Sequence, residues 1–140
     1  MSRFSLLRLT ATLSLVTLLF FGASACDSSG NDEDTTPPSA PSALAGASED
    51  GTVALEWSAP SDGDLDGYRV YRSTSSFSDA GAATRASGDG LVSGESYSDD
   101  EASNGTTYYY RVAAVDEAGN ESDLSGEIQK TPFPDPPNNP

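Results

Sequence analysis

The sequence predicts an all-β fold in which seven short strands form a β-sandwich. Two observations carry this prediction. Apolar and polar residues alternate in several short runs between Pro38 and Pro132, and clusters of Gly, Asp, Asn and Ser separate these runs. The same region lacks the recurrence of apolar residues every three or four positions that marks an amphipathic helix.

Each predicted strand rests on its own alternation. In "TVALEWS", Val53, Leu55 and Trp57 alternate with more polar residues, which indicates a strand with one buried face. The run "TTYYYRVAAVD" is the longest and places Tyr108 and Tyr110 on the same face. In chain order, the predicted strands are 43–47, 52–58, 67–72, 83–86, 95–98, 106–116 and 124–131.

The first 25 residues are predicted to be an export signal rather than part of the fold. Arg3 and Arg8 supply the charged beginning, an apolar stretch covers 13–21, and small residues follow at 22–25. The apolar stretch is shorter than the roughly 20 residues that a transmembrane helix requires. We therefore exclude residues 1–25 from the domain.

The single cysteine of the chain, Cys26, directly follows this segment. The letters "ASAC" resemble the lipobox of bacterial lipoproteins, although Ala23 stands where Leu is usual. The resemblance implies that Cys26 is lipidated and that acyl chains anchor the protein to a membrane of the bacterial cell envelope, inner or outer. The alternative is ordinary secretion, which would leave a soluble protein that begins at Cys26.

Two polar segments are predicted to flank the domain. Residues 26–37 are polar and acidic and end at a proline, so we expect a disordered linker after the lipidated cysteine. Residues 133–140 form a Pro-rich tail, which is either a frayed end or a linker of the kind that connects tandem modules. The folded domain is therefore expected to cover 38–132, as a monomer.

Composition excludes several classes of function. The chain contains no His and one Cys, so it lacks the commonest general base and cannot form an internal disulfide. Its 22 Asp and Glu against seven Lys and Arg give a net charge of −15, which repels nucleic acid. We expect no enzyme activity, no cofactor and no nucleic-acid partner.

Residues 38–132 resemble a fibronectin type III domain. The resemblance is carried by "PPSAPSALAG", by Trp57 in "LEWSAP", by "GYRVYR" and by "GTTYYYRVAAVDEAGNES". It implies an immunoglobulin-like β-sandwich. It also implies that Trp57 is the central core residue and that Tyr108 forms the tyrosine corner, in which its hydroxyl bonds a nearby backbone group. Both are expected to be structural.

The loop "SDGDLDG" contains the alternating acids Asp62, Asp64 and Asp66, as a calcium loop does at its start. A helix–loop–helix calcium site also needs Glu at its twelfth position, which here is Ser73, and a helix where the sequence predicts a strand. We therefore predict a turn and no metal site. A loosely held cation on these three carboxylates is the alternative.

One candidate binding face stands out. Arg69 and Tyr71 are predicted to lie beside Tyr109 and Arg111 on the outward face of two neighbouring strands. Tyr and Arg are enriched at binding hot spots, but they also stack on one another to cover a sheet. If the domain has a recognition surface, we expect it there.

These expectations together predict a non-catalytic envelope lipoprotein that displays one fibronectin type III module. By analogy with the family, the module would bind an envelope protein or a polysaccharide. The alternatives are a purely structural spacer and, if Cys26 is not lipidated, a secreted soluble binder.

Overall fold

A computed structural model describes residues 33–135 of the chain. The predicted signal segment, Cys26 and most of the predicted tail lie outside this range. The elements, in order, are β1 (Ser42–Glu49), β2 (Thr52–Ser58), β3 (Leu65–Ser73), a short 3-10 helix (Ala80–Ala82), β4 (Thr84–Arg85), β5 (Ser96–Asp99), β6 (Tyr108–Asp116) and β7 (Ile128–Lys130).

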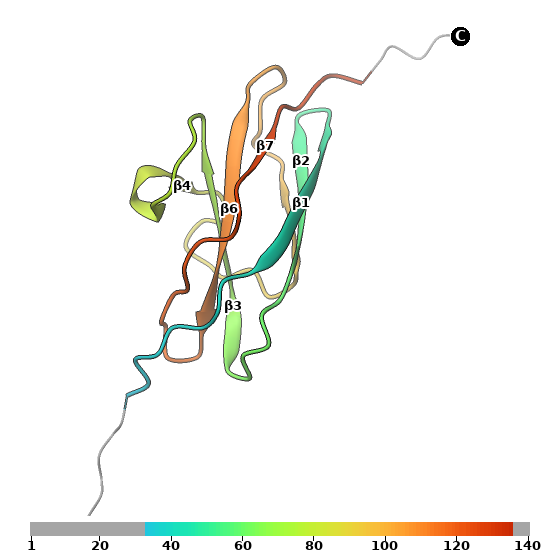
Figure 1. The fold of residues 1–140 in the computed structure, drawn as a ribbon. Helices are drawn as coiled ribbons and strands as arrows, with labels where there is room; N and C mark the ends of the chain where they lie inside the picture. Colours follow the sequence, from blue (N-terminus) through green and yellow to red (C-terminus); the bar gives the residue numbers. More distant parts are fainter. Residues whose placement is uncertain (1–32, 136–140) are drawn as a thin grey trace, which may run out of the picture. The chain divides into compact units, whose positions relative to one another are not determined.

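Two antiparallel sheets pack into a sandwich, which confirms the predicted fold class. One sheet has three strands in the order β1-β2-β5, and the other has four in the order β4-β3-β6-β7. The described chain enters at one end of the sandwich and leaves at the other, beside the turn that joins β1 and β2 (Figure 1).

The core forms where the inward faces of the two sheets meet. Val53, Leu55 and Trp57 on β2 are at most 5% exposed, as their alternation predicts. The Trp57 ring packs edge-on against Tyr68, with 5.3 Å between the ring centroids. Trp57 therefore lies in the core between the sheets.

Tyr108 lies at the start of β6, with its ring at the edge of the core and 9% of the residue exposed. Its hydroxyl accepts a hydrogen bond from the backbone N–H of Ser103, at 3.2 Å. This bond from Ser103 lowers the pKa of the Tyr108 hydroxyl, because it stabilises the negative oxygen. The contact ties the loop before β6 to the strand itself.

A buried ion pair connects the two sheets. Asp99, at the end of β5, is 1% exposed, and both of its carboxylate oxygens accept hydrogen bonds from the Arg72 guanidinium on β3, each at 2.8 Å. The hydroxyl of Tyr110 on β6 donates a third bond to Asp99, at 2.8 Å. Arg72 also lies over the ring of Tyr108, with its central carbon 5.1 Å from the centroid.

Between β6 and β7 the chain follows the sheet edge without forming a regular strand, so the strand predicted at 124–131 is reduced to β7. Two serines of this segment provide the hydrogen bonds that a regular strand would form with β6. The hydroxyl of Ser122 accepts from the N–H of Ala114, and that of Ser125 accepts from the N–H of Val112. Their own N–H groups donate to the carbonyls of the same two residues. The edge is thereby satisfied without a regular strand.

We expect Ala43→Gly to stabilise the domain. Ala43 is exposed in the bulge of β1 and has a φ of 52°, a conformation that costs a residue with a Cβ about 1–2 kcal/mol. Glycine removes this cost but loses more entropy on folding. The expected net gain is ~0.5 kcal/mol, measured by urea denaturation. The control is Ala45→Gly, at an exposed site of the same strand, which should destabilise the domain. Equal changes in the free energy of unfolding at both sites would show that the positive φ of Ala43 does not strain the backbone.

We expect Asp99→Ala to destabilise the domain by about 3–5 kcal/mol, because it leaves the Arg72 cation without its buried partner. Tyr110→Phe removes a single hydrogen bond from the same carboxylate and should cost only about 1–2 kcal/mol. Chemical denaturation of both variants measures the difference. If the two variants unfold at the same denaturant concentration, the ion pair does not hold the sheets together.

Candidate functional site

The structure brings the four residues of the predicted binding face together. Arg69 and Tyr71 lie on β3, Tyr109 and Arg111 lie on β6, and Tyr71 pairs directly with Arg111 in the antiparallel register. Their shared face is the outward side of the four-stranded sheet. We call these four residues the Arg–Tyr face.

The Arg–Tyr face is largely covered, which differs from the open surface that the sequence predicts. Tyr71 is only 5% exposed, because Phe77, from the connection between β3 and β4, packs against it and against Ala113. Leu124 and Tyr109 border this second apolar cluster. Sequence reasoning missed Phe77, although it is the only large apolar residue in the polar run "STSSFSDAG".

Both arginines of this face are paired with carboxylates from the segment between β6 and β7. Arg69 forms an ion pair with Glu121, whose other oxygen accepts a bond of 2.5 Å from the Tyr71 hydroxyl. Burial, followed by this hydrogen bond to Glu121, raises the pKa of Tyr71. Arg111 donates to the carbonyl of Ser125 at 2.7 Å. The positive charge of the face is therefore mostly neutralised.

Glu127 fastens the β3–β4 connection onto the sheet. Its carboxylate accepts from the Ser76 hydroxyl at 2.8 Å and from the Phe77 N–H at 3.0 Å, and it lies 3.5 Å from the Nε of Arg111. The bond from Phe77, aided by the bond from Ser76 and the positive charge of Arg111, lowers the pKa of Glu127. The carboxylate of Glu127 thus joins the β6–β7 segment to the β3–β4 connection.

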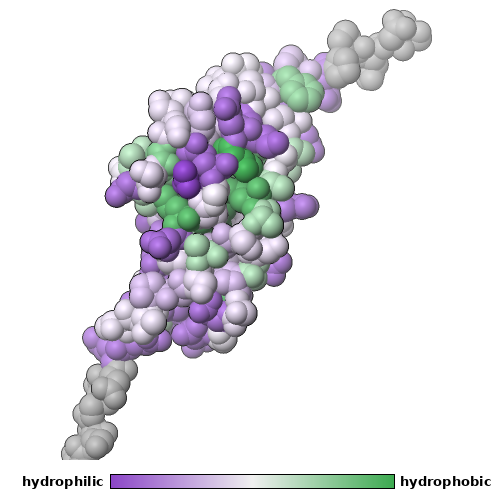
Figure 2. All heavy atoms as spheres, in the orientation of Figure 1, coloured by the Kyte–Doolittle hydropathy of each residue, from purple (hydrophilic) through white to green (hydrophobic). Residues whose placement is uncertain are grey.

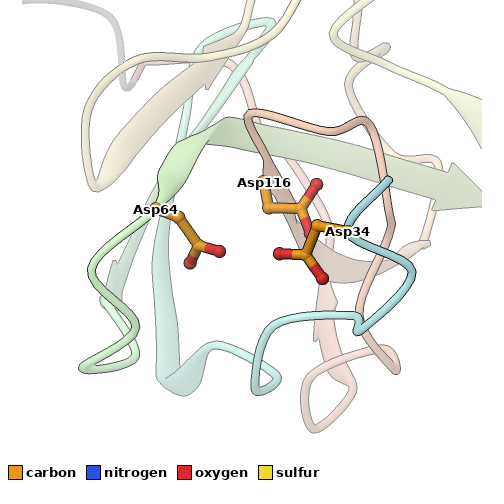
Figure 3. A group of neighbouring side chains, drawn as sticks. All are labelled: Asp34, Asp64 and Asp116. Carbon is orange, nitrogen blue, oxygen red and sulfur yellow. The ribbon is translucent and has the colours of Figure 1, made fainter. Parts of the chain in front are cut away.

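The acidic side chains that converge near the loop before β3 are not the three that the sequence predicts. Within residues 33–135, the acidic side chains that converge are Asp34, Asp64 and Asp116, each with an oxygen within 4.8 Å of the others (Figure 3). Asp66 lies in β3 and is not a member of this group, whereas Asp62 accepts a bond of 3.2 Å from the Ser39 N–H. Only Asp64 of the predicted three belongs to the cluster.

These three aspartates are the described residues that could hold a hard cation, since carboxylate oxygens are its preferred ligands. Asp116 is 1% exposed, and its two oxygens already accept bonds from the backbone and side-chain N–H groups of Asn120, at 2.8 and 2.9 Å. Burial acts to raise the pKa of Asp116, but the bonds from Asn120 and the neighbouring backbone lower it overall. The arrangement is that of a closed turn.

The linker predicted at 26–37 makes contact with the domain inside the described range. The side-chain amide of Asn120 donates to the carbonyl of Asp34, at 2.9 Å. The chain is therefore attached to the β6–β7 loop four residues before the predicted start of the domain. No helix within residues 33–135 has the length and hydropathy needed to cross a bilayer.

We expect the stability of the domain to decline as the pH falls through the acidic range, and Glu127→Gln to weaken this dependence. The folded-state pKa of Glu127 is lowered, so its contribution is present above the unfolded value of about 4.3 and is lost as the pH falls through the lower folded value. Thermal unfolding between pH 7 and pH 2 measures both curves. Glu117→Gln, at an exposed site, is the control; identical slopes for all three proteins would contradict the role of Glu127.

Comparisons with known proteins agree with this architecture. The family model for the fibronectin type III domain described as the SaeA third domain matches residues 41–131. An amylopullulanase from Thermoanaerobacterium saccharolyticum is 38% identical over 97 residues, which are 69% of this chain and 7% of that protein. Exoglucanase B from Cellulomonas fimi is 39% identical over 102 residues, or 70% of this chain and 8% of that enzyme. The chain thus spans less than a tenth of either relative.

Solved structures share the fold. A fibronectin type III-like protein from Clostridium thermocellum superposes with a TM-score of 0.55 and 29% identity, over 69% of this chain and 96% of that one. A human fibronectin type III domain superposes with a TM-score of 0.58 at 19% identity, over 76% and 97% of the two chains, which supports the fold alone. Because the family model covers more than half of the sequence, this chain belongs to the fibronectin type III family.

Proposed function

We propose that this chain is a non-catalytic, membrane-anchored envelope lipoprotein that displays a single fibronectin type III module for binding a protein or a polysaccharide. The observation that carries the proposal is the order of its parts: a lipobox-like "ASAC" ending at Cys26, an acidic linker, and then the module. A module of this family is typically non-catalytic, and relatives carry it as a small part of larger glycoside hydrolases.

The proposed binding role is compatible with the composition of the chain. The chain has no His, and the buried member of the acidic cluster, Asp116, already accepts hydrogen bonds from Asn120 with both of its oxygens. A polysaccharide is a reasonable ligand class, because the named activities of the relatives are those of an amylopullulanase and an exoglucanase.

The second candidate is a structural spacer, and one observation favours it. The described chain enters and leaves the sandwich at opposite ends, so the module separates whatever its two ends are joined to (Figure 1). The packing of Phe77 against Tyr71 also leaves less of the Arg–Tyr face open to a ligand. A spacer would keep its function when any exposed side chain of the module is replaced.

The mass of the mature protein tests the anchor. We expect protein purified from bacterial membranes to exceed the mass of the chain from Cys26 to Pro140 by a glyceryl group and its acyl chains. The variant Cys26→Ser should keep its signal segment and lack the added mass, because serine has no thiol to modify. An unmodified chain that begins at Cys26 in the soluble fraction would contradict the anchor and favour a secreted binder.

A further inference from the structure

Three segments meet at the end of the sandwich where the described chain leaves it: the β1–β2 turn, the β5–β6 loop and the residues after β7. The side chain of Asn104 accepts from the Gly51 N–H at 2.8 Å and donates to the Asp50 carboxylate at 2.6 Å. The loop and the turn are therefore locked to each other, and the side chains of Asp50 and Asn104 stay exposed to solvent.

The residues after β7 are fixed to this end as well. The carbonyl of Pro132 accepts from the Gly105 N–H at 2.9 Å, and the N–H of Phe133 donates to the Glu49 carbonyl at 3.3 Å. Pro132 is fully buried. Phe133, which the sequence assigns to the Pro-rich tail, thus has a backbone that is bonded to the domain.

The Phe133 side chain is the exception among the large apolar residues of the described chain. It is 54% exposed, whereas the other large hydrophobic side chains of residues 33–135 are buried or partly buried. On the face shown in Figure 2, apolar surface gathers in patches that hydrophilic residues interrupt. A single exposed apolar residue needs no explanation by itself. An aromatic residue with a fixed backbone is a more specific arrangement when the same end also presents the exposed, mutually bonded side chains of Asp50 and Asn104.

Resting on the proposed function, we infer that this end of the module is its ligand-binding surface, with Phe133 as a stacking platform and a neutral polysaccharide as the ligand. An aromatic face covers the apolar side of a sugar ring, while the Asp50 carboxylate and the Asn104 amide accept and donate hydrogen bonds to hydroxyl groups. An anionic polysaccharide does not suit this end, because the chain carries a net charge of −15 and the exposed acids Glu49 and Asp50 lie in the segment whose backbone bonds Phe133.

Sedimentation of the mature full-length protein with insoluble polysaccharide tests this inference. The probes are microcrystalline cellulose, granular starch and, as the anionic comparison, polygalacturonate gel. We expect the wild-type protein to sediment with at least one neutral polymer and not with polygalacturonate. Phe133→Ala should weaken this binding at least about tenfold, as the loss of a central aromatic contact does.

Two further variants make the result specific. Phe133→Trp keeps an aromatic ring and should retain binding, whereas Glu117→Ala removes an exposed side chain near the opposite end, where its N–H bonds the carbonyl of Asp64, and should bind as the wild type does. Equal binding by Phe133→Ala and the wild type would overturn the assigned surface but leave the proposed function standing. Binding of the wild type to none of the polymers, or to polygalacturonate alone, would overturn the ligand class.

Discussion

The carboxylate of Asp99 is the constraint on which the arrangement of the two sheets depends. A buried charge costs several kcal/mol unless a partner and hydrogen bonds compensate it, and Asp99 finds both on the opposite sheet, in Arg72 and Tyr110. Apolar packing alone is non-directional and allows the sheets to slide. The ion pair requires β5 to stand opposite the ends of β3 and β6, and it places Arg72 over the Tyr108 ring, next to the corner that closes the same end of the sandwich.

Local periodicity was sufficient to predict most of the fold. The strands of the core, β2, β3 and β6, have one face or both faces covered, and their alternation of apolar residues is visible in single runs of sequence. The last strand was predicted too long, because Ser122 and Ser125 bond β6 through their side chains, and alternation cannot distinguish this from a regular ladder. The Asp99–Arg72 pair joins residues 27 positions apart, so no local pattern could reveal it.

The surface of the domain was less predictable for a related reason. The alternation in β3 and β6 correctly places Arg69, Tyr71, Tyr109 and Arg111 on one face, yet whether that face meets solvent depends on the connection that folds over it. Phe77 was the available signal, an isolated apolar residue in a serine-rich run. The acidic cluster likewise combines Asp64 with residues 30 positions before it and 52 positions after it, which the spacing of the loop acids could not indicate. The periodicity of one segment cannot predict the contacts that its side chains make with segments distant in the sequence.

The opposite placement of the two ends of the described chain has a mechanical consequence. A pull between them acts along the long axis of the sandwich and first loads β1 and β7, which belong to different sheets and contact each other. Hydrogen bonds in an antiparallel ladder run across the strands, so such a pull shears many of them at once instead of opening them one after another. The ladder between β1 and β2 is therefore the element of the described chain that resists such a pull first.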